Sequence, residues 1–428
     1  MPAPARMAAG LRRDRAPALG LNDPLARPQS ESLAPTAERF VLERSFGAPT
    51  INARITENPI PEFRQRKPEE RERNATSRGA TAGSERAVEL GLDFLARHQA
   101  PDGRWTLDKF DNGRPGYEAA GLAQMQSDTA ATGLALLAFF GAGYTHLDGK
   151  YRQQVGSALD YLVGNQKADG DLFTSGSPYV WLYSHGIASI ALCEAYGMTR
   201  DPRLREPAQK ALDFIIAAQH PTQGGWRYAP QRESDTSVSG WQMMALKSGE
   251  LSGLNVPGTT YERLNGWLDY AQASGQQGSR YVYLPASRQP QQRSPSVVMT
   301  AEALLMRLYL GWERNDPRLI AGADYLLANL PRYGTASQPS RDAYYWYYAT
   351  QVMFQVQGPH WETWNAQLRD LLVNSQVRQG QLIGSWDPLG PQPDRWGRQA
   401  GRIYVTTMHL LMLEVYYRHL PLYRTLGQ

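Results

Sequence analysis

The sequence predicts an all-α fold, an (α/α)6 barrel or toroid, from three observations. An amphipathic helical phrase recurs six times after residue 86, a more apolar helical segment follows each copy, and a glutamine-to-aromatic corner ends several copies. Alternating amphipathic and fully apolar helices solve a single packing problem, because the apolar set can form an inner ring that the amphipathic set covers. We therefore expect residues 86–424 to form one domain.

The outer helices are predicted from the amphipathic phrase. GLDFLARHQ (91–99), ALDYLVGNQ (158–166) and ALDFIIAAQ (211–219) are variants of it, and each places apolar residues on one face of a helix. An aspartate in the phrase marks all six copies: Asp93, Asp160, Asp213, Asp269, Asp324 and Asp370.

The inner helices are predicted from six segments that are apolar almost all round. A helix with no polar face must be buried on every side, which places these segments inside the ring. They span residues 127–143, 184–197, 234–249, 299–311, 344–355 and 404–417.

The stretch QAPDGRW (99–105) predicts how the outer helices end. The glutamine amide can satisfy backbone groups that the helix terminus leaves free, and a glycine then turns the chain. We expect this role for Gly103, Gly170 and Gly225. An aromatic side chain should then fill the gap between neighbouring repeats, and the candidates are Trp105, Phe173, Trp226 and Trp386.

Composition limits the function classes. The net charge is +4, so neither a nucleic acid nor an anionic membrane is required as a partner. Cys193 is the single cysteine, which excludes an internal disulfide and a CxxC site. Charges at 12–15 interrupt any signal-peptide core, and no apolar run reaches transmembrane length, so we expect a soluble, cytoplasmic protein.

Residues 1–85 are rich in Pro, Arg, Ala and Ser. Such a composition buries too little apolar surface to offset chain entropy, so we predict a disordered or extended tail or linker. An arm that wraps the domain is the alternative, with FVLERSF (40–46) as the segment that would dock.

The corner phrase resembles a known family. QAPDGRW matches the QxxxGxW signature of the squalene–hopene cyclase and oxidosqualene cyclase repeats, and looser versions occur at 166–173, 219–226 and 376–386. Over about residues 86–424 the chain looks like the terpenoid cyclase/protein prenyltransferase superfamily of α/α toroids, also called prenyltransferase and squalene oxidase repeat proteins. The resemblance implies the fold and an isoprenoid or lipid ligand, but a fold hosts many reactions.

The resemblance also implies an acidic phrase, DxDDTA, at the start of an inner helix, whose middle aspartate protonates the substrate. MQSDTA (125–130) and RESDTS (232–237) keep Asp128 and Asp235, but serine stands at the proton-donating position. A serine hydroxyl cannot protonate an alkene. We predict that Asp128, His185 and Asp235 meet at one mouth as an acid/base or metal cluster. The alternative is that the Ser-Asp-Thr segments cap helices.

A zinc site is left open. The resemblance to prenyltransferases implies an Asp-x-Cys unit and a distant histidine, but Ala191 stands two residues before Cys193. His409 lies where the family's histidine is expected, with packing in the core as its alternative role. Oxygen and nitrogen ligands could still come from Asp128, His185, Asp235 and His409.

Aromatic residues near the inner-helix starts are the predicted substrate-binding residues. Ring faces stabilise cations, which carbocation chemistry requires. Filling the barrel interior is the alternative role of these side chains. They are Trp181, Tyr183, Trp241, Tyr347 and Tyr404.

Two function classes follow from the sequence. The first is an isoprenoid-active enzyme, cyclase-like or prenyltransferase-like, with altered catalytic groups and an apolar central cavity. The second is a non-catalytic toroid that binds a protein or lipid, with a filled interior. A polysaccharide-cleaving barrel would need paired carboxylates across a groove, and the sequence assigns no such pair.

Overall fold

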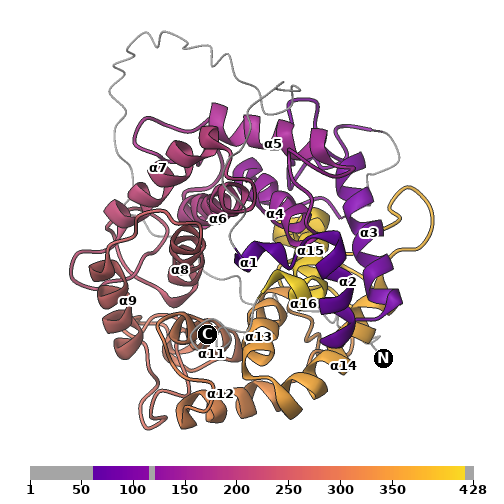
Figure 1. Ribbon diagram of the computed structural model, residues 1–428. Helices are drawn as coiled ribbons and strands as arrows, with labels where there is room; N and C mark the ends of the chain where they lie inside the picture. The colour runs from indigo at the N-terminus through magenta and orange to yellow at the C-terminus, as the bar shows by residue number, and fades with distance from the viewer. Residues whose placement is uncertain (1–60, 115–120, 420–428) are drawn as a thin grey trace, which may run out of the picture. The chain divides into compact units, whose positions relative to one another are not determined.

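The computed structural model describes residues 61–114 and 121–419, and within these ranges the regular structure is helical (Figure 1). The inner helices are α4 (Asp128–Gly141), α6 (Trp181–Thr199), α8 (Thr236–Leu251), α11 (Val297–Tyr309), α13 (Ala343–Val356) and α15 (Gly397–Leu413). The outer helices are α3 (Ala82–Arg97), α5 (Arg152–Gly164), α7 (Pro202–Ala218), α9 (Gly258–Tyr270), α12 (Pro317–Leu327) and α14 (Gly358–Ser375). Short helices are α1 (Pro61–Arg64), α2 (Pro68–Ser77), η1 (Pro178–Val180), α10 (Pro290–Arg293) and α16 (Val415–Arg418).

The inner helices form a closed ring. Each packs against the next in chain order, and α15 packs against α4. Every residue of α13 is buried, as are all residues of α6 except Trp181 and Tyr183. The outer helices bury one face only, for example Leu92 and Leu95 of α3. The predicted (α/α)6 barrel is therefore confirmed.

The glutamine at each predicted corner donates two hydrogen bonds from its amide. Gln99 Nε2 donates to the carbonyl of Gly103 within its own corner, at 2.7 Å, and to the carbonyl of Gln154 in α5, at 2.8 Å. The same pair of bonds, one inside the corner and one to the next outer helix, is made by Gln166, Gln219 and Gln376. Each corner thus joins two successive repeats.

The last corner closes the ring. Gln376 donates to the carbonyl of Ala87 in α3, at 2.7 Å, and so ties the sixth outer helix to the first. The bond spans 289 positions of the chain. The sixth repeat is therefore hydrogen-bonded to the first.

Tryptophan follows three of the corners and binds in two directions. Trp105 donates from its backbone N–H to Thr132 Oγ1 of α4, at 3.0 Å, and from its indole to the carbonyl of Leu95, at 2.8 Å. Trp226 and Trp386 make equivalent bonds.

The prediction that Phe173 fills the gap between repeats in the second corner is wrong. In the second corner it is Leu172 that donates to the inner helix, whereas the Phe173 side chain is only partly buried.

The turning glycines fit tightly against the next outer helix. Gly103 and Gly170 have φ values of +92° and +95°, as expected for the left-handed region. In the third corner the turn is made by Gly224, with φ of +83°, and not by Gly225. A Cβ atom on Gly224 would lie 2.1 Å from the carbonyl oxygen of Arg263 in α9.

Helical structure begins ahead of the predicted boundary at residue 86. Residues 61–85, predicted to be part of a disordered or extended tail, form α1, α2 and the start of α3. Although the segment is polar overall, two of its side chains, the ring of Phe63 and the guanidinium of Arg66, are buried in the domain. Residues 1–60, including the segment 40–46, lie outside the described residues.

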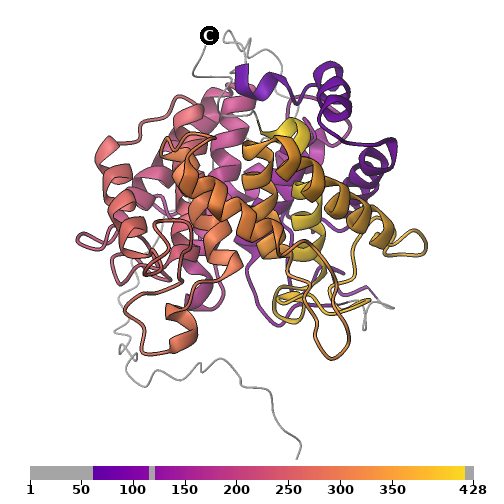
Figure 2. The same cartoon turned by 90° about the horizontal axis from the view of Figure 1, so that it is seen from below.

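Arg66 completes a buried ion cluster at the end of the barrel where the inner helices finish. It donates to Glu194 Oε2 of α6 at 2.7 Å, and Arg418 donates to Glu194 Oε1 at 2.7 Å. Arg66 also donates to the carbonyl of Arg418, at 3.1 Å. The N-terminal helices α1 and α2 and the C-terminal helix α16 therefore gather at this end (Figure 2).

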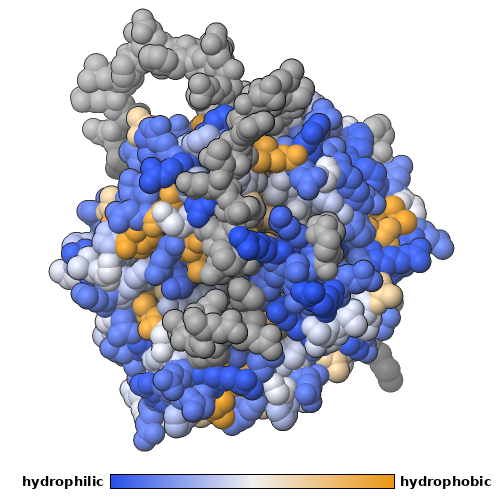
Figure 3. Space-filling view, viewed as in Figure 1, coloured by the Kyte–Doolittle hydropathy of each residue, from blue (hydrophilic) through white to orange (hydrophobic). Residues whose placement is uncertain are grey.

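The outer surface matches this packing. On the face in Figure 3, hydrophilic residues predominate among the described residues, and the hydrophobic ones form scattered patches. None of the described helices has the length and hydropathy needed to cross a bilayer.

The corner geometry can be tested with two glycines of the same repeat. Gly224→Ala should lower the free energy of unfolding by at least about 2 kcal/mol, because it adds left-handed strain to a backbone clash. Gly266→Ala should raise that free energy by about 0.5–1 kcal/mol, because Gly266 lies within α9 with open space around its Cα. Chemical denaturation measures both. Equal effects of the two substitutions would contradict the corner geometry.

Candidate functional site

The two Ser-Asp-Thr segments begin α4 and α8, but in different registers. Ser127 is the N-cap of α4, and its hydroxyl accepts from the N–H of Ala130 at 3.1 Å. Asp235 is the N-cap of α8, and its Oδ1 accepts from the N–H of Val238 at 2.7 Å. Both segments therefore satisfy their own helix termini, as the capping alternative predicted.

Asp128 lies at the edge of a surface cleft. It is the first residue of α4 and forms an ion pair with Arg104 at 3.2 Å. Burial raises the pKa of its carboxyl group. The cleft is lined by Asp102, Arg104, Asp128, Asp160, Tyr161, Asn165, Thr174 and Ser175.

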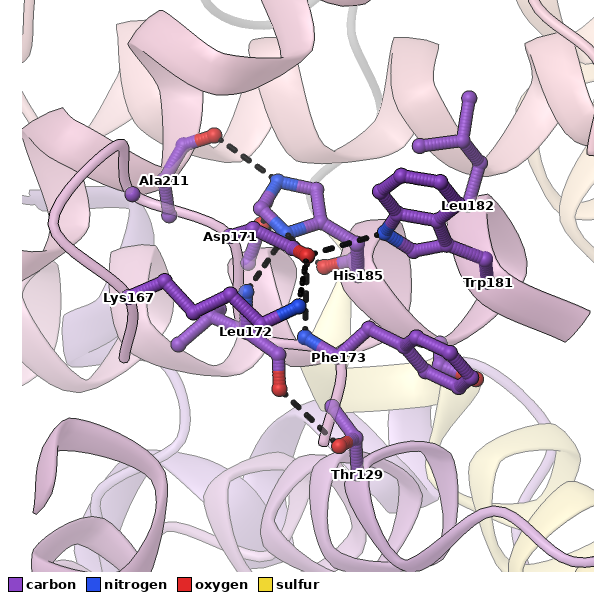
Figure 4. A network of polar contacts seen from close by, with 12 residues as sticks. Thr129, Lys167, Asp171, Leu172, Phe173, Trp181, Leu182, His185 and Ala211 are labelled. Carbon is purple, nitrogen blue, oxygen red and sulfur yellow. Dashed lines mark hydrogen bonds and ion pairs between the residues drawn. The ribbon is translucent and has the colours of Figure 1, made fainter. Parts of the chain in front are cut away.

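His185 is fixed by the backbone on both sides of its ring (Figure 4). Its Nδ1 accepts from the N–H of Leu172 at 3.1 Å, and its Nε2 lies 3.0 Å from the carbonyl of Ala211. The carboxylate of Asp171 also lies 3.4 Å from Nδ1. His185 thus joins the second corner to α7, in the position where the other corners use a threonine or serine hydroxyl.

Trp181 belongs to the same network. Its indole N–H donates to Asp171 Oδ2 at 3.0 Å, and Lys167 donates to the same oxygen at 2.7 Å (Figure 4). The Phe173 ring stacks on Trp181 at a centroid distance of 6.2 Å. The contacts of Trp181 are therefore those of a structural residue in the second corner.

Asp235 is fully buried. Burial raises the pKa of its carboxyl group to about 7. Besides the cap bond, its Oδ2 accepts from the hydroxyl of Tyr283 at 2.9 Å, and that hydroxyl lies 2.6 Å from the hydroxyl of Tyr228. These partners differ from those of Asp128 and His185, so the three predicted catalytic residues do not form one hydrogen-bonded cluster.

The expected zinc ligands are not brought together either. In residues 61–114 and 121–419, no group of three or more His, Cys, Asp or Glu side chains could hold a metal ion. His409 is buried, and burial lowers the pKa of its ring well below the usual value. Its ring stacks on Trp346 at 6.3 Å and meets the edge of Trp386 at 5.3 Å, which is the core-packing alternative.

A different set of side chains meets inside the inner ring. The hydroxyls of Ser237 (α8) and Tyr344 (α13) lie 2.8 Å apart, and the indole of Trp241 (α8) donates to Tyr344 at 3.0 Å. Because α11 separates α8 from α13 in the ring, these contacts cross its interior. We name the axial cluster by six residues: Tyr183, Ser237, Trp241, Glu302, Tyr344 and Tyr348.

Glu302 of α11 is the acid of the axial cluster. It is fully buried, and Gly240 leaves it room, since a Cβ there would lie 2.4 Å from Glu302 Oε1. Oε1 accepts from the hydroxyl of Tyr344 at 3.0 Å, and the hydroxyl of Tyr348 is the second hydrogen-bonding group beside the carboxyl group. Burial raises the pKa of Glu302 well above its usual value. Burial therefore favours the neutral form of this carboxyl group.

Aromatic rings surround this acid. Trp241 stacks on Tyr347 with centroids 5.8 Å apart and an interplanar angle of 11°. Tyr348 meets Trp241 at 5.9 Å and Tyr344 at 5.2 Å, both edge to face. The hydroxyl of Tyr348 acts on Glu302 and on Tyr344. Of the predicted substrate-binding residues, Trp241 thus belongs to the axial cluster and Tyr347 stacks on it.

Tyr183 and Tyr404 are the other two predicted aromatic residues. Tyr183 donates to Ser237 Oγ at 2.9 Å and so belongs to the axial cluster. Both tyrosines are partly exposed, yet burial raises the pKa of each hydroxyl well above its usual value. The charge of Glu302 contributes to the shift of Tyr404.

Glu302, Ser237 and Tyr344 were not predicted as site residues. A signal for Glu302 was present, because it is the one acidic residue of the largely apolar segment MTAEALLMRLYLG (299–311), whose other charged residue is Arg307. An acid in a helix that must be buried all round has to be paired or neutral.

Two further carboxylates share the N-terminus of α13. Asp342 is its N-cap and accepts from the N–H of Tyr345 at 3.0 Å, and Asp394 accepts from the N–H of Ala343 at 2.8 Å. Burial, followed by the charge of Asp394, raises the pKa of Asp342 to about 7.

Comparison with known proteins was made at the level of sequence and of structure. Neither a family model nor a curated protein sequence matches the chain. Solved structures do match. The cellobiose 2-epimerase of Bacillus thermoamylovorans has a TM-score of 0.55 at 12% identity, with 77% of this chain and 97% of that chain covered.

Two other enzymes are similar in the same way. An inactive variant of an alpha-1,6-mannanase of Salegentibacter, in complex with alpha-1,6-mannotriose, has a TM-score of 0.54 at 10% identity, covering 78% of this chain and 99% of that one. A type II terpene cyclase variant from Scytonema, in complex with geranylgeranyl dihydroxybenzoate, has a TM-score of 0.50 at 14% identity, covering 78% and 97%.

The chain is an α/α toroid. The fold is shared by an epimerase, a mannanase and a terpene cyclase, so the likeness shows the fold and does not choose among these reactions.

The paired carboxylates at α13 predict a pH-dependent stability. A carboxyl group whose pKa is raised to about 7 by folding binds more protons when folded, so its contribution to stability is present at low pH and lost as the pH rises toward and through 7. Asp342→Asn keeps a cap acceptor but cannot ionise. The free energy of unfolding of this variant should therefore rise relative to that of the wild type between about pH 4 and pH 7 and stay level above that. Urea denaturation at several pH values measures the difference, and a difference that does not change with pH would contradict the assignment.

Proposed function

We propose that the protein is an isoprenoid-active enzyme in which Glu302 donates a proton to an unsaturated, apolar ligand inside the inner ring. The observation that carries the proposal is the fully buried Glu302, whose neutral form burial favours and whose carboxyl group lies beside the rings of Tyr344 and Tyr348. The likeness in fold to a terpene cyclase bound to a geranylgeranyl compound supports the ligand class.

The chemistry suits such an acid. Glu302 would transfer its proton to one alkene carbon, so that a C–H bond forms, the π bond breaks and the neighbouring carbon becomes cationic. The faces of Trp241, Tyr344 and Tyr348 can stabilise that cation. The reaction ends when the cation loses a proton from a neighbouring carbon and a C=C bond forms again. Substrate and product therefore have the same atoms, and the reaction is an isomerisation. A carboxyl group kept neutral by apolar surroundings is the form that can donate.

This proposal moves the acid away from the Ser-Asp-Thr segments. Asp235 is the N-cap of α8, and its ionised form adds to the raised pKa of Glu302, which burial causes in the first place. Asp128 and His185 take no part in the proposed chemistry, because the first lies at the surface cleft and the second is held by backbone groups.

A non-catalytic toroid that binds a lipid or protein is the second candidate function. The observation that favours it is the capping role of both Ser-Asp-Thr segments. The two candidates differ in turnover, which makes them separable by experiment.

The role of Glu302 is tested with Glu302→Gln. Purified protein is incubated with squalene and with polyprenyl diphosphates, and the products are analysed by mass spectrometry. The variant should lose turnover by roughly 10²–10⁴-fold, because glutamine fills the same space and cannot donate a proton to carbon. Ligand retention should stay at the wild-type level.

Glu414→Gln is the matched control. Glu414 is also a fully buried glutamate, and burial raises its pKa well above the usual value. It lies at the end of α15, outside the axial cluster. This variant should turn over as the wild type does. Unchanged turnover in Glu302→Gln would contradict the acid role. A wild-type protein that neither converts nor retains any of these lipids would contradict the isoprenoid proposal.

A further inference from the structure

A continuous chain of hydroxyl groups leads to Glu302 from the side of α6. Tyr183 donates to Ser237 Oγ at 2.9 Å, the Ser237 and Tyr344 hydroxyls lie 2.8 Å apart, and Tyr344 donates to Glu302 Oε1 at 3.0 Å. The chain begins on α6, crosses α8 and α13, and ends on α11. All three distances are those of ordinary O–H···O hydrogen bonds.

The bonds of the chain have one consistent direction. Tyr344 has one hydroxyl proton, which it gives to Glu302, and its oxygen also accepts from the indole of Trp241 at 3.0 Å. Ser237 must therefore donate to Tyr344, which leaves the Ser237 oxygen free to accept from Tyr183. Every donor in the chain points toward Glu302.

The two ends of the chain have different surroundings. Glu302, Ser237 and Tyr344 are buried, whereas Tyr183 is partly exposed. Tyr183 is thus the member of the chain that a proton from solvent can reach. The far end is the carboxyl group that, in the proposed function, gives its proton away from Oε2 and must recover one.

We propose that Tyr183, Ser237 and Tyr344 form a proton relay that reloads Glu302 from the solvent side of α6. This inference rests on the proposed function, because it assigns the relay to the acid named there. It makes Ser237 a positioning residue that is indispensable to repeated turnover, although it does not touch the reacting carbon.

The relay balances proton for proton. Solvent gives one proton to the Tyr183 oxygen as Tyr183 passes its own to Ser237, Ser237 passes one to Tyr344, and Tyr344 passes one to Oε1 of the ionised Glu302. No hydroxyl gains or loses a net proton, and the acid is neutral again. The proton arrives on Oε1, so a half-turn of the carboxyl group about its Cγ–Cδ bond brings it to the side of Oε2, and the hydroxyls turn back before the next cycle. Hydrogen bonds of the chain polarise one another, which favours concerted transfer.

The relay is tested by infrared spectroscopy of the full chain on transfer from H₂O to D₂O. The protonated Glu302 carboxyl should give a carbonyl band that Glu302→Gln removes, and the rate at which this band shifts reports exchange of its proton. In Ser237→Ala this exchange should be at least about tenfold slower, because the chain is cut at its middle. Where the wild type turns over, Ser237→Ala should complete a first turnover and slow in later ones.

Thr407→Val is the matched control. Thr407 is a buried inner-helix residue whose hydroxyl bonds only backbone carbonyls of its own helix, those of Ile403 and Tyr404. Its removal should leave exchange at the wild-type rate. Tyr183→Phe cuts the chain at its partly exposed end and should slow exchange as Ser237→Ala does, which keeps the test available if Ser237→Ala does not fold.

The outcomes separate the two proposals. A Glu302 band that exchanges equally fast in the wild type, Ser237→Ala and Tyr183→Phe would overturn the relay and leave the acid role intact. A wild-type spectrum without any band that Glu302→Gln removes would overturn the acid role, and the relay with it.

Discussion

The glutamine amide at each corner is the interaction on which the barrel depends. Each amide binds one carbonyl of its own corner and one of the next outer helix, so the position of each repeat is set by its neighbour. A buried backbone carbonyl without a hydrogen bond destabilises the fold, and each glutamine amide satisfies two such carbonyls. Gln376 applies the same geometry between the last repeat and the first, and this bond turns a row of helix pairs into a closed ring.

The closed ring explains the character of the site. Because the inner helices form a closed ring, residues from α8 and α13 meet although α11 stands between them. An acid placed there is withdrawn from water, and burial raises the pKa of Glu302 well above its usual value. The surroundings of the proposed acid thus depend on the closed ring of inner helices and not on a local sequence motif.

The sequence predicted the ring because helix type can be read from periodicity. It could not decide between adjacent residues at the corners. QHPTQGGW contains two glycines, and only the backbone shows that Gly224 takes the left-handed conformation. At residues 171–173 the sequence likewise suggested Phe173 as the residue that contacts the inner helix, but it is Leu172 that makes this contact.

The site was harder to predict than the fold. Asp128, Asp235 and His185 were chosen for their chemistry and their place near helix starts, but the sequence does not say which partner a polar side chain finds. Backbone groups took both nitrogens of His185 and one oxygen of Asp235. Glu302 could have been found, since an acid in an all-round apolar helix conflicts with its surroundings, and such conflicts gather at functional sites.

The Arg66–Glu194–Arg418 cluster bears on how the molecule is made. Glu194 lies in the second inner helix, and its two cations come from opposite ends of the polypeptide, 352 positions apart. During synthesis, α1 and α6 leave the ribosome long before Arg418, so this carboxylate has only one of its two counter-charges until then. Contacts of such separation are slow to form. The two ends of the ring therefore meet only after all the helices between them have been made.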